Sequence, residues 1–228
     1  MFFQSILLQA TPEIATPEEI RSISLLELIQ AGGWVMIPIL LLAIIAIYLF
    51  FERYFTISSA NKKRKDNLLE QVRELVLQGN VQGAAALCEQ TSSPISRMIH
   101  KGILRLGSPL KHIEASIENV GKIEIAKLEK NLPILATISG AAPTIGFLGT
   151  VIGMIQTFIE IHRTQAQDIS GMAGGIYEAL ITTAAGLSVG LLAYMAYNFL
   201  STKIQKIIHD MEASSIEFLD VLQEPTDA

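Results

Sequence analysis

The fold class that this sequence predicts is an all-α, polytopic membrane protein with three transmembrane helices, and three observations support it. Half of the 228 residues are apolar and 17% are charged, with a mean hydropathy of +0.41. The apolar residues are collected in long uncharged runs that alternate with charged stretches. Thirteen of the 17 Lys and Arg residues lie in one region, between the first two of these runs. This layout is typical of an integral membrane protein and not of a soluble domain.

Each apolar run is long enough to cross a membrane. A hydrocarbon core of about 30 Å is spanned by roughly 20 helical residues. The sequence accordingly predicts transmembrane helices at 28–51, 132–159 and 178–202. Pro38 and Pro143 lie inside these runs, where neighbouring helices can satisfy the carbonyl groups that a proline leaves without a donor.

The basic residues predict the orientation of the chain. Beyond the thirteen at 52–131, two follow the third run, and one each lies in the N-terminal arm 1–27 and the loop 160–177. Lys and Arg are enriched on the cytoplasmic side of membrane proteins. We therefore expect 52–131 and the C-terminal helix 203–228 in the cytoplasm, and the arm and the loop on the other side.

The N-terminal arm is expected to be retained. It has no Lys or Arg before its short apolar run, so it lacks the charged start of a secretory signal. Apolar residues at helical spacing in 24–33 predict a helix that lies along the membrane surface.

The region 52–131 is predicted to be helical throughout. Apolar residues recur at helical spacing from Leu68 to Val76, and a Gly-Asn turn and a Ser-Pro pair each precede a further short helix. From Pro109 onward this spacing continues to the second apolar run without a breaker. We therefore expect one long helix leaving the membrane here and another after the third span, the two packing as a cytoplasmic helical bundle.

Small residues mark one side of the second and third spans. Glycines follow G-x-x-x-G spacing in both, at Gly149–Gly153 and Gly186–Gly190, and Gly146 lies one turn before the first pair. Such faces let helices approach closely, although the motif alone is common in apolar sequence. Its occurrence in both spans favours a close, inward-facing pair. The first span is rich in Leu and Ile and is expected to face lipid.

Glu178 is the most informative residue of the third span. A carboxyl group beside the hydrocarbon usually faces protein or a water-filled cavity, although it can also lie at the outer interface. Thr150, Thr182 and Thr183 are the nearby hydroxyl groups that could share a polar path, or could simply bond back to a carbonyl one turn earlier. At 100° per residue, Thr182 shares the helix face of Glu178 and Thr183 is turned about 140° away.

No Asp, Lys, Arg or His lies within the three predicted spans. A proton relay usually needs a chain of titratable groups, so one Glu per subunit is too little for a self-contained pump. Either the chain forms no ion path, or another subunit supplies the missing acid.

Other chemistry finds little support in the sequence. The four histidines are far apart, and the GMAGG run lacks the lysine of a phosphate loop, so we expect no metal, no cofactor and no enzyme. The basic run at 62–65 follows a span end, which favours membrane lipid headgroups over nucleic acid as its partner. Cys88, the single cysteine, is predicted to be an inert buried residue.

Two long motifs resemble one known family. The stretch AAPTIGFLGTVIGMIQTFIEI, at 141–161, and the stretch GIYEALITTAAGLSVGLLA, at 175–193, are similar to two patterns of the MotA/TolQ/ExbB proton-channel family. A G-x-x-x-x-A-x-x-x-C segment that ends at Cys88, followed by Ser-Pro, fits as well. The resemblance covers nearly all of the chain beyond the N-terminal arm.

The resemblance implies a stator-like unit of the bacterial inner membrane, with the N-terminus in the periplasm. Subunits would form a ring, a pentamer by resemblance, around an ExbD-like partner whose single transmembrane helix carries a proton-accepting Asp. The matched path positions are Thr150, Glu178 and Thr183. The motif thus favours Thr183, whereas the helix geometry pairs Thr182 with Glu178, and both stay open.

The resemblance further implies that proton flow energises a TonB-like protein for outer-membrane nutrient uptake. Three spans argue against the four-span MotA branch and leave the ExbB and TolQ branches, of which ExbB is the more similar. A TolQ-like role in envelope integrity and a non-conducting membrane scaffold are the alternatives.

Overall fold

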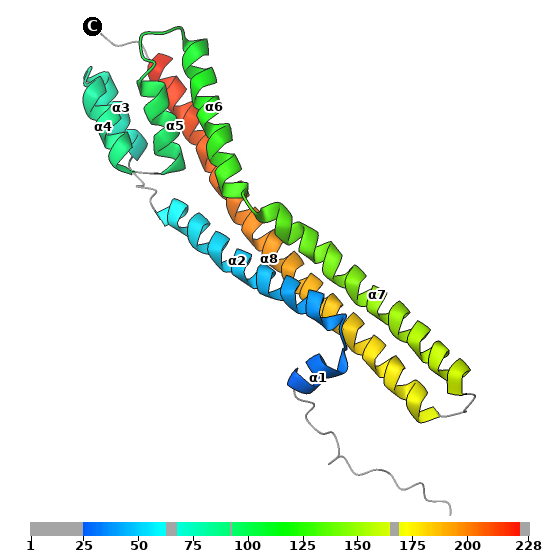
Figure 1. Ribbon diagram of the computed structural model, residues 1–228. Helices are drawn as coiled ribbons and strands as arrows, with labels where there is room; N and C mark the ends of the chain where they lie inside the picture. Colours follow the sequence, from blue (N-terminus) through cyan, green and yellow to red (C-terminus); the bar gives the residue numbers. More distant parts are fainter. Residues whose placement is uncertain (1–24, 63–67, 92, 165–168, 224–228) are drawn as a thin grey trace, which may run out of the picture.

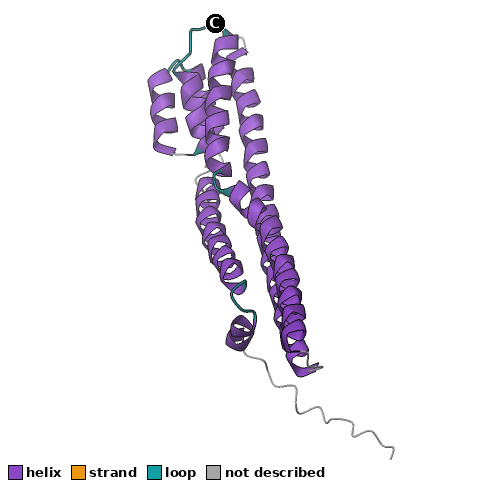
Figure 2. Cartoon of the chain, turned by 45° about the vertical axis from the view of Figure 1, so that its right-hand side comes forward, coloured by secondary structure: helices purple, strands orange, loops and turns teal. Residues whose placement is uncertain are grey.

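The computed structural model describes residues 25–62, 68–91, 93–164 and 169–223, which form helices joined by short turns and loops, with no strand among them (Figures 1 and 2). The helices are α1 (Leu25–Ala31), α2 (Met36–Lys62), α3 (Leu68–Leu77), α4 (Val81–Thr91), α5 (Pro94–Ile103), α6 (Leu110–Glu129), α7 (Leu132–Thr164) and α8 (Ile169–Gln223). The predicted arm up to residue 24 and the basic residues 63–65 lie outside the described residues.

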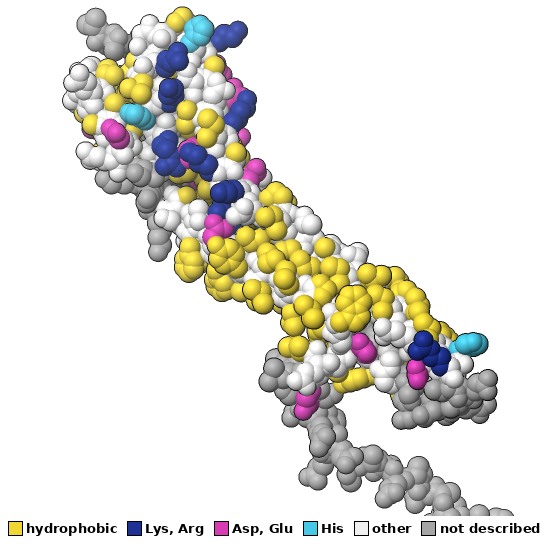
Figure 3. Space-filling model, in the orientation of Figure 1, with side chains coloured by type: hydrophobic (Ala, Val, Ile, Leu, Met, Phe, Trp, Pro, Cys, Tyr) yellow, Lys and Arg dark blue, Asp and Glu magenta, His cyan; other side chains and the backbone are white. Residues whose placement is uncertain are grey.

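The predicted all-α membrane fold is confirmed. Three helical stretches of the described chain are long and apolar enough to cross a membrane, and they are carried by α2, α7 and α8. These helices run side by side as an elongated unit (Figure 1). In the space-filling view, apolar side chains form a band along its middle, and charged side chains gather beyond both ends of the band (Figure 3). One end carries α1, and the other, the bundle end, carries α3 to α6.

The first predicted span is interrupted near its start. The short helix α1 is followed by a turn at 32–35, and α2 begins only at Met36. Gly33 has a φ of +60°, a left-handed conformation that glycine adopts without steric cost. The Gly-Gly pair therefore separates a short helix from the membrane helix, in place of the continuous segment 28–51.

The expectation of one unbroken helix from Pro109 into the second span was wrong. The helix is interrupted between α6 and α7, where Lys130 is extended and Asn131 has a φ of 66°. Asparagine tolerates this left-handed conformation better than most residues. Pro133, two residues on, has no N–H to donate to the carbonyl of Glu129, so an α-helix could not continue without a missing bond.

The helix ends also differ from the predicted loop 160–177. α7 continues to Thr164 and α8 begins at Ile169, so only four residues between them lie outside the described helices. From there α8 runs for 55 residues, through the membrane band and on to the bundle end (Figure 1). This single long helix therefore carries the third apolar span and also one helix of the bundle.

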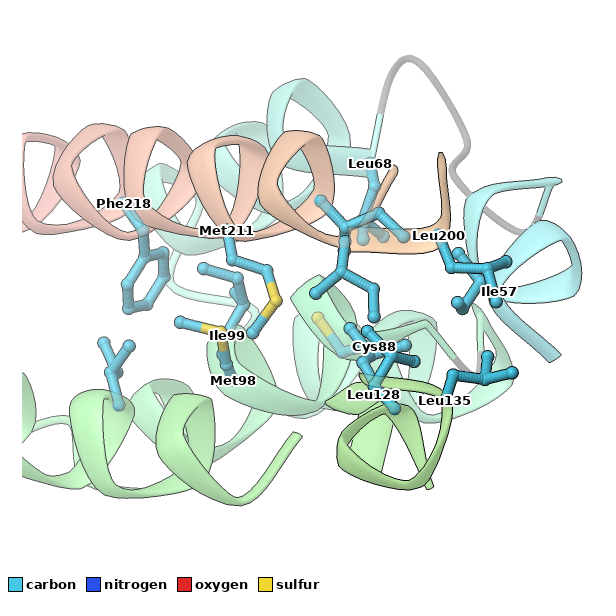
Figure 4. Packing of buried hydrophobic residues seen from close by; sticks show 14 of the residues in the cluster. Ile57, Leu68, Cys88, Met98, Ile99, Leu128, Leu135, Leu200, Met211 and Phe218 are labelled. Atoms are coloured by element: carbon cyan, nitrogen blue, oxygen red, sulfur yellow. The ribbon is translucent and has the colours of Figure 1, made fainter. Parts of the chain in front are cut away.

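The helical bundle is built around the second half of α8. Phe218 and Met211 of α8 pack against Ile99 of α5 in a buried apolar cluster (Figure 4). Gly102 keeps α5 close to this helix, because a Cβ atom there would lie 2.7 Å from the Phe218 ring. The first turn of α5 is fixed by a capping box, in which Ser93 and Ser96 each bond the other's backbone N–H at 3.0 and 2.9 Å.

Candidate functional site

The candidate site lies where α7 and α8 pack against each other in the apolar part of the molecule. Gly146 of α7 faces Gly186 of α8, and their backbones are in contact. A Cβ atom at position 186 would lie 2.6 Å from the Ala142 carbonyl oxygen and 2.9 Å from the Gly146 Cα. A Cβ atom at position 146 would lie 2.8 Å from the Thr182 carbonyl oxygen. Only glycine permits this approach at either position.

The other three predicted packing glycines lie along the same contact. Gly149 faces the side chain of Thr182, and Gly153 faces Ala179, whose Cβ would be 3.0 Å from an added Cβ atom. Gly190 accommodates the ring of Pro143, which a side chain at 190 would displace. All five glycines are therefore placed in one helix–helix contact.

Thr183 links the two helices by a hydrogen bond. Its hydroxyl donates to the carbonyl oxygen of Gly146 on α7 at 3.0 Å. This carbonyl belongs to a glycine at which the two backbones meet, so the bond crosses the backbone contact. Thr183 thereby has a specific partner on the neighbouring helix.

Thr182 lies on a different side of α8 and uses its hydroxyl locally. It is 1% exposed, and its hydroxyl donates to the carbonyl oxygen of Ala179, one turn earlier, at 2.8 Å. Its side chain fills the space beside Gly149, which is also approached by Val35 of the turn before α2. Thr182 therefore points to the place where this turn, α7 and α8 meet.

Glu178 faces the turn between α1 and α2. The side chain is half-buried, and a Cβ atom at Gly33 would overlap its carboxylate. One turn further along α8, Ile181 approaches the neighbouring Gly32. Glu178 is thus directed towards the turn before α2, whereas Thr183 is directed towards Gly146 of α7 and Thr182 lies between them, against Gly149 of α7 and Val35 of the turn. In the single chain, the helix-face argument and the family motif select two different surfaces of α8.

Thr150 is half-buried on α7, one turn from Gly146 towards the α1 end. Its hydroxyl donates to the carbonyl oxygen of Phe147 at 2.6 Å, so it bonds back within its own helix. Residues four apart lie on the same face of a helix, which places Thr150 on the face where Thr183 contacts Gly146. Thr150 therefore lies one helical turn along α7 from the carbonyl group that Thr183 contacts.

The sequence reasoning missed the contribution of the turn at 32–35. This turn closes over α8 at the level of Glu178 and Thr182, and its close approach depends on Gly32 and Gly33. A Gly-Gly pair is a recognised turn signal, and it lies inside the run that we predicted as a continuous segment. The hydrophobicity of the flanking residues concealed it.

A charged cluster lies at the bundle end of the membrane helices. Glu124 of α6 is buried, and it accepts hydrogen bonds from Arg97 of α5 and, at 2.7 Å, from Lys127. Burial, the largest single influence, raises the pKa of Glu124, but these two cations together outweigh it and hold the pKa below its ordinary value. Such a buried carboxylate fixes α5 against α6.

The end of α2 is attached to the same region. Arg53 is 5% exposed, pairs with the adjacent Glu52 and donates to the carbonyl oxygen of Lys127 at 3.3 Å. Asn131, the residue that interrupts the helix, donates to Glu52 at 3.3 Å. The break between α6 and α7 is thus connected to the first membrane helix.

Comparison with known proteins identifies relatives of this arrangement. The model of the MotA/TolQ/ExbB proton channel family matches residues 90–213. The biopolymer transport protein ExbB-like 1 of Synechocystis sp. is 32% identical over 180 residues, which cover 77% of this chain and 70% of that protein. TolQ of Haemophilus influenzae, a Tol-Pal system protein, is 39% identical over 99 residues, 43% of each chain. The biopolymer transport protein ExbB of Xanthomonas campestris pv. campestris is 41% identical over 85 residues, 37% of this chain and 34% of that protein.

The family match extends over more than half of the chain and includes α5, α6, α7 and most of α8. It therefore contains the glycine-lined contact of α7 and α8, together with Thr150, Glu178, Thr182 and Thr183. Together with the three apolar helices, it supports a multi-pass protein of the inner membrane with a function of the proton-channel type. The chain belongs to the MotA/TolQ/ExbB proton channel family.

Proposed function

We propose that this chain is an ExbB-like, ring-forming subunit of a motor driven by the proton motive force. In this proposal it acts with an ExbD-like partner and energises a TonB-like protein for outer-membrane nutrient uptake. The observation that carries the proposal is the α7–α8 pair itself. Its backbones touch at glycines, a threonine hydroxyl crosses the contact, and one carboxyl group lies near its α1 end.

The scarcity of titratable groups supports a partner. Glu178 is the single Asp, Glu, Lys, Arg or His within 28–51, 132–159 and 178–202. One acid that faces the turn at Gly33 does not form a continuous relay along α8. A partner helix bearing an Asp would supply the group that is protonated and deprotonated in each cycle.

The surface of the membrane helices supports self-association. α7 has a face of exposed apolar residues turned away from α8, and α8 has another turned away from α7 and α2. These residues include Phe147, Leu148, Val151, Ile155 and Phe158 of α7, and Leu180, Leu187 and Leu191 of α8. In a ring, such faces would contact neighbouring copies or lipid, and a pentamer is the number that the family resemblance suggests.

In the proposed mechanism, protons pass from the periplasm to the partner Asp and then to the cytoplasm. Each proton that crosses the membrane releases about 2.3 kcal/mol per 100 mV. Neutralising the Asp would let the partner helices step relative to the ring. Thr150 and Thr183 would line the path, and Glu178 would hold cations at the periplasmic entrance or set the register of the partner.

The proposed orientation places α3 to α6 and the C-terminus in the cytoplasm, and the N-terminus in the periplasm. The excess of Lys and Arg at 52–131 supports it. An ExbB-like role is supported over a TolQ-like one by the relatives that align over most of the chain, which carry ExbB-like names. The TolQ relative aligns over less than half of it. A TolQ-like role in envelope integrity is therefore the second candidate.

The deciding experiment is purification of the chain from its native membrane in mild detergent, followed by mass measurement of the intact complex. We expect several copies of this chain together with a protein that has one transmembrane helix bearing an Asp. Recovery of the chain without such a partner would support a scaffold instead.

Glu178→Gln then tests the ion path. If energised uptake and envelope integrity both survive this change, Glu178 has no part in conduction.

A further inference from the structure

A narrow groove runs between α2 and α8 on the membrane-facing part of the molecule. Its volume is about 470 Å³, and its walls are almost entirely apolar. Four alanines keep the groove open, and aromatic rings stand at the end nearest the bundle. The alanines are Ala43, Ala46, Ala193 and Ala196, and the rings are those of Phe50, Phe51 and Phe199.

The dimensions of the groove admit a hydrocarbon chain. It follows α8 over residues 189–199, about 16 Å at 1.5 Å per residue, which is comparable to half of a hydrocarbon core of about 30 Å. The groove therefore has the length of one leaflet.

The end of the groove next to the bundle carries positive charge. The Lys203 ammonium lies 4.3 Å from the centre of the Tyr54 ring and 4.7 Å from that of Phe199, which also lines the groove. The rings of Tyr54 and Phe199 are stacked, with centroids 6.3 Å apart. These contacts hold Lys203 at the groove end. Lys206 lies exposed one turn further along α8, and neither lysine forms an ion pair within the described part of the chain.

We propose that this groove binds a phospholipid with an anionic headgroup in the leaflet next to the helical bundle. One acyl chain lies between α2 and α8, and the headgroup phosphate is bound by Lys203 and Lys206. An acyl chain is in an apolar environment whether or not it enters the groove, so entry alone gives no selectivity. The charge of the two lysines selects the headgroup, and the groove fixes the position of the lipid.

Native mass spectrometry of the full-length protein, with any partner that co-purifies, tests this site. Dioleoyl phosphatidylglycerol and dioleoyl phosphatidylethanolamine are added separately at low ionic strength. A basic residue near an anionic headgroup contributes roughly a fivefold gain in affinity, so we expect phosphatidylglycerol to bind about 25-fold more tightly. Lys203→Gln should reduce this preference about fivefold, and Lys111→Gln, an equal loss of charge at the far end of α6, should leave it unchanged.

A second pair of variants tests the groove. Ala43→Phe places a ring inside it, whereas Ile44→Phe places the same ring on the adjacent residue, which is 68% exposed and outside the groove. We expect Ala43→Phe to abolish the tight binding of phosphatidylglycerol and Ile44→Phe to preserve it. Full retention of binding in Ala43→Phe would overturn the proposal, because the lysines would then attract the lipid without the groove. Equal affinity of the wild-type protein for the two lipids would overturn it as well.

Discussion

Replacing Gly33 by alanine would test whether the turn between α1 and α2 positions the carboxylate of Glu178. Gly33 has a φ of +60°, and an added Cβ atom would overlap the Glu178 carboxylate. The turn is also held against α8 through Gly32, next to Ile181. Because the turn cannot easily retreat, we expect the carboxylate to move away from it, towards the surface of α8 that faces neither α2 nor the turn.

A matched control separates the cost of the left-handed backbone conformation from the displacement of Glu178. An L-residue in a left-handed conformation costs about 1–2 kcal/mol, and this part should also appear in Gly79→Ala. Gly79 has a φ of +75° and no atom within 4 Å of its added Cβ. The atoms nearest the added Cβ at Gly33 are those of the Glu178 carboxylate, at the end of a flexible side chain that can shift at little cost. We therefore expect both variants to lose about 1–2 kcal/mol of stability, and the Glu178 carboxylate to move in Gly33→Ala alone.

The assay has two readouts on the detergent-purified protein. Chemical unfolding gives the two losses of stability, and modification of Glu178 by a hydrophobic carbodiimide, followed by mass spectrometry, reports where the carboxylate lies. We expect the modification rate to change several-fold in Gly33→Ala and to stay at the wild-type rate in Gly79→Ala. Unchanged modification of Glu178 in Gly33→Ala would refute the proposed positioning.

Three further predictions concern Thr183, Gly186 and Glu124. Thr183→Val should lose about 1 kcal/mol of folding stability, because it removes the hydrogen bond to Gly146. It should also lower proton flux in reconstituted vesicles more than Thr182→Val, because the Thr182 hydroxyl bonds only within its own helix. Gly186→Ala should force α7 and α8 apart and lower the thermal unfolding midpoint, whereas Gly140→Ala, where nothing lies within 4 Å of the added Cβ, should raise or preserve it. Glu124→Gln should destabilise the protein near neutral pH, because the folded-state pKa of Glu124 is lowered by Arg97 and Lys127. The stability that Glu124 contributes is present above its unfolded-state pKa and is lost as the pH falls through its folded-state pKa. The thermal unfolding midpoints of the wild-type protein and of Glu124→Gln should therefore converge in acid. A difference between these midpoints that does not change with pH would contradict the ion-pair account.

The membrane helices were predictable because their signal is local. A run of about 20 uncharged apolar residues must form a helix in a bilayer, where each backbone N–H and C=O needs a partner within its own segment. The breaks in the helices were harder to predict. Gly32–Gly33 and Asn131 are single turns within strongly helical surroundings, and the conformation at Asn131 depends on contacts such as its bond to Glu52 from a distant part of the chain.

The candidate site was predictable as a set of residues and not as an arrangement. The helical period alone placed Thr182 on the face of Glu178 and turned Thr183 away from it. In the structure Thr183 contacts Gly146 of α7, whereas Glu178 faces the turn before α2. The helical period could not predict which helix or turn each face contacts. The residues around Glu178 do not indicate that its carboxylate lies beside Gly33, 145 residues earlier in the chain.

By itself, the sequence determined the all-α class, the three apolar helices and the residues that could form a polar path, because hydrophobicity, charge and helical period are properties of short segments. Only the tertiary structure decided which helix each face meets. Thr183 is directed to Gly146 of α7, and Glu178 to the turn that precedes α2. The physical reason is that helix contacts are set by the fit of small residues on two surfaces at once, and a single segment specifies only one of those surfaces.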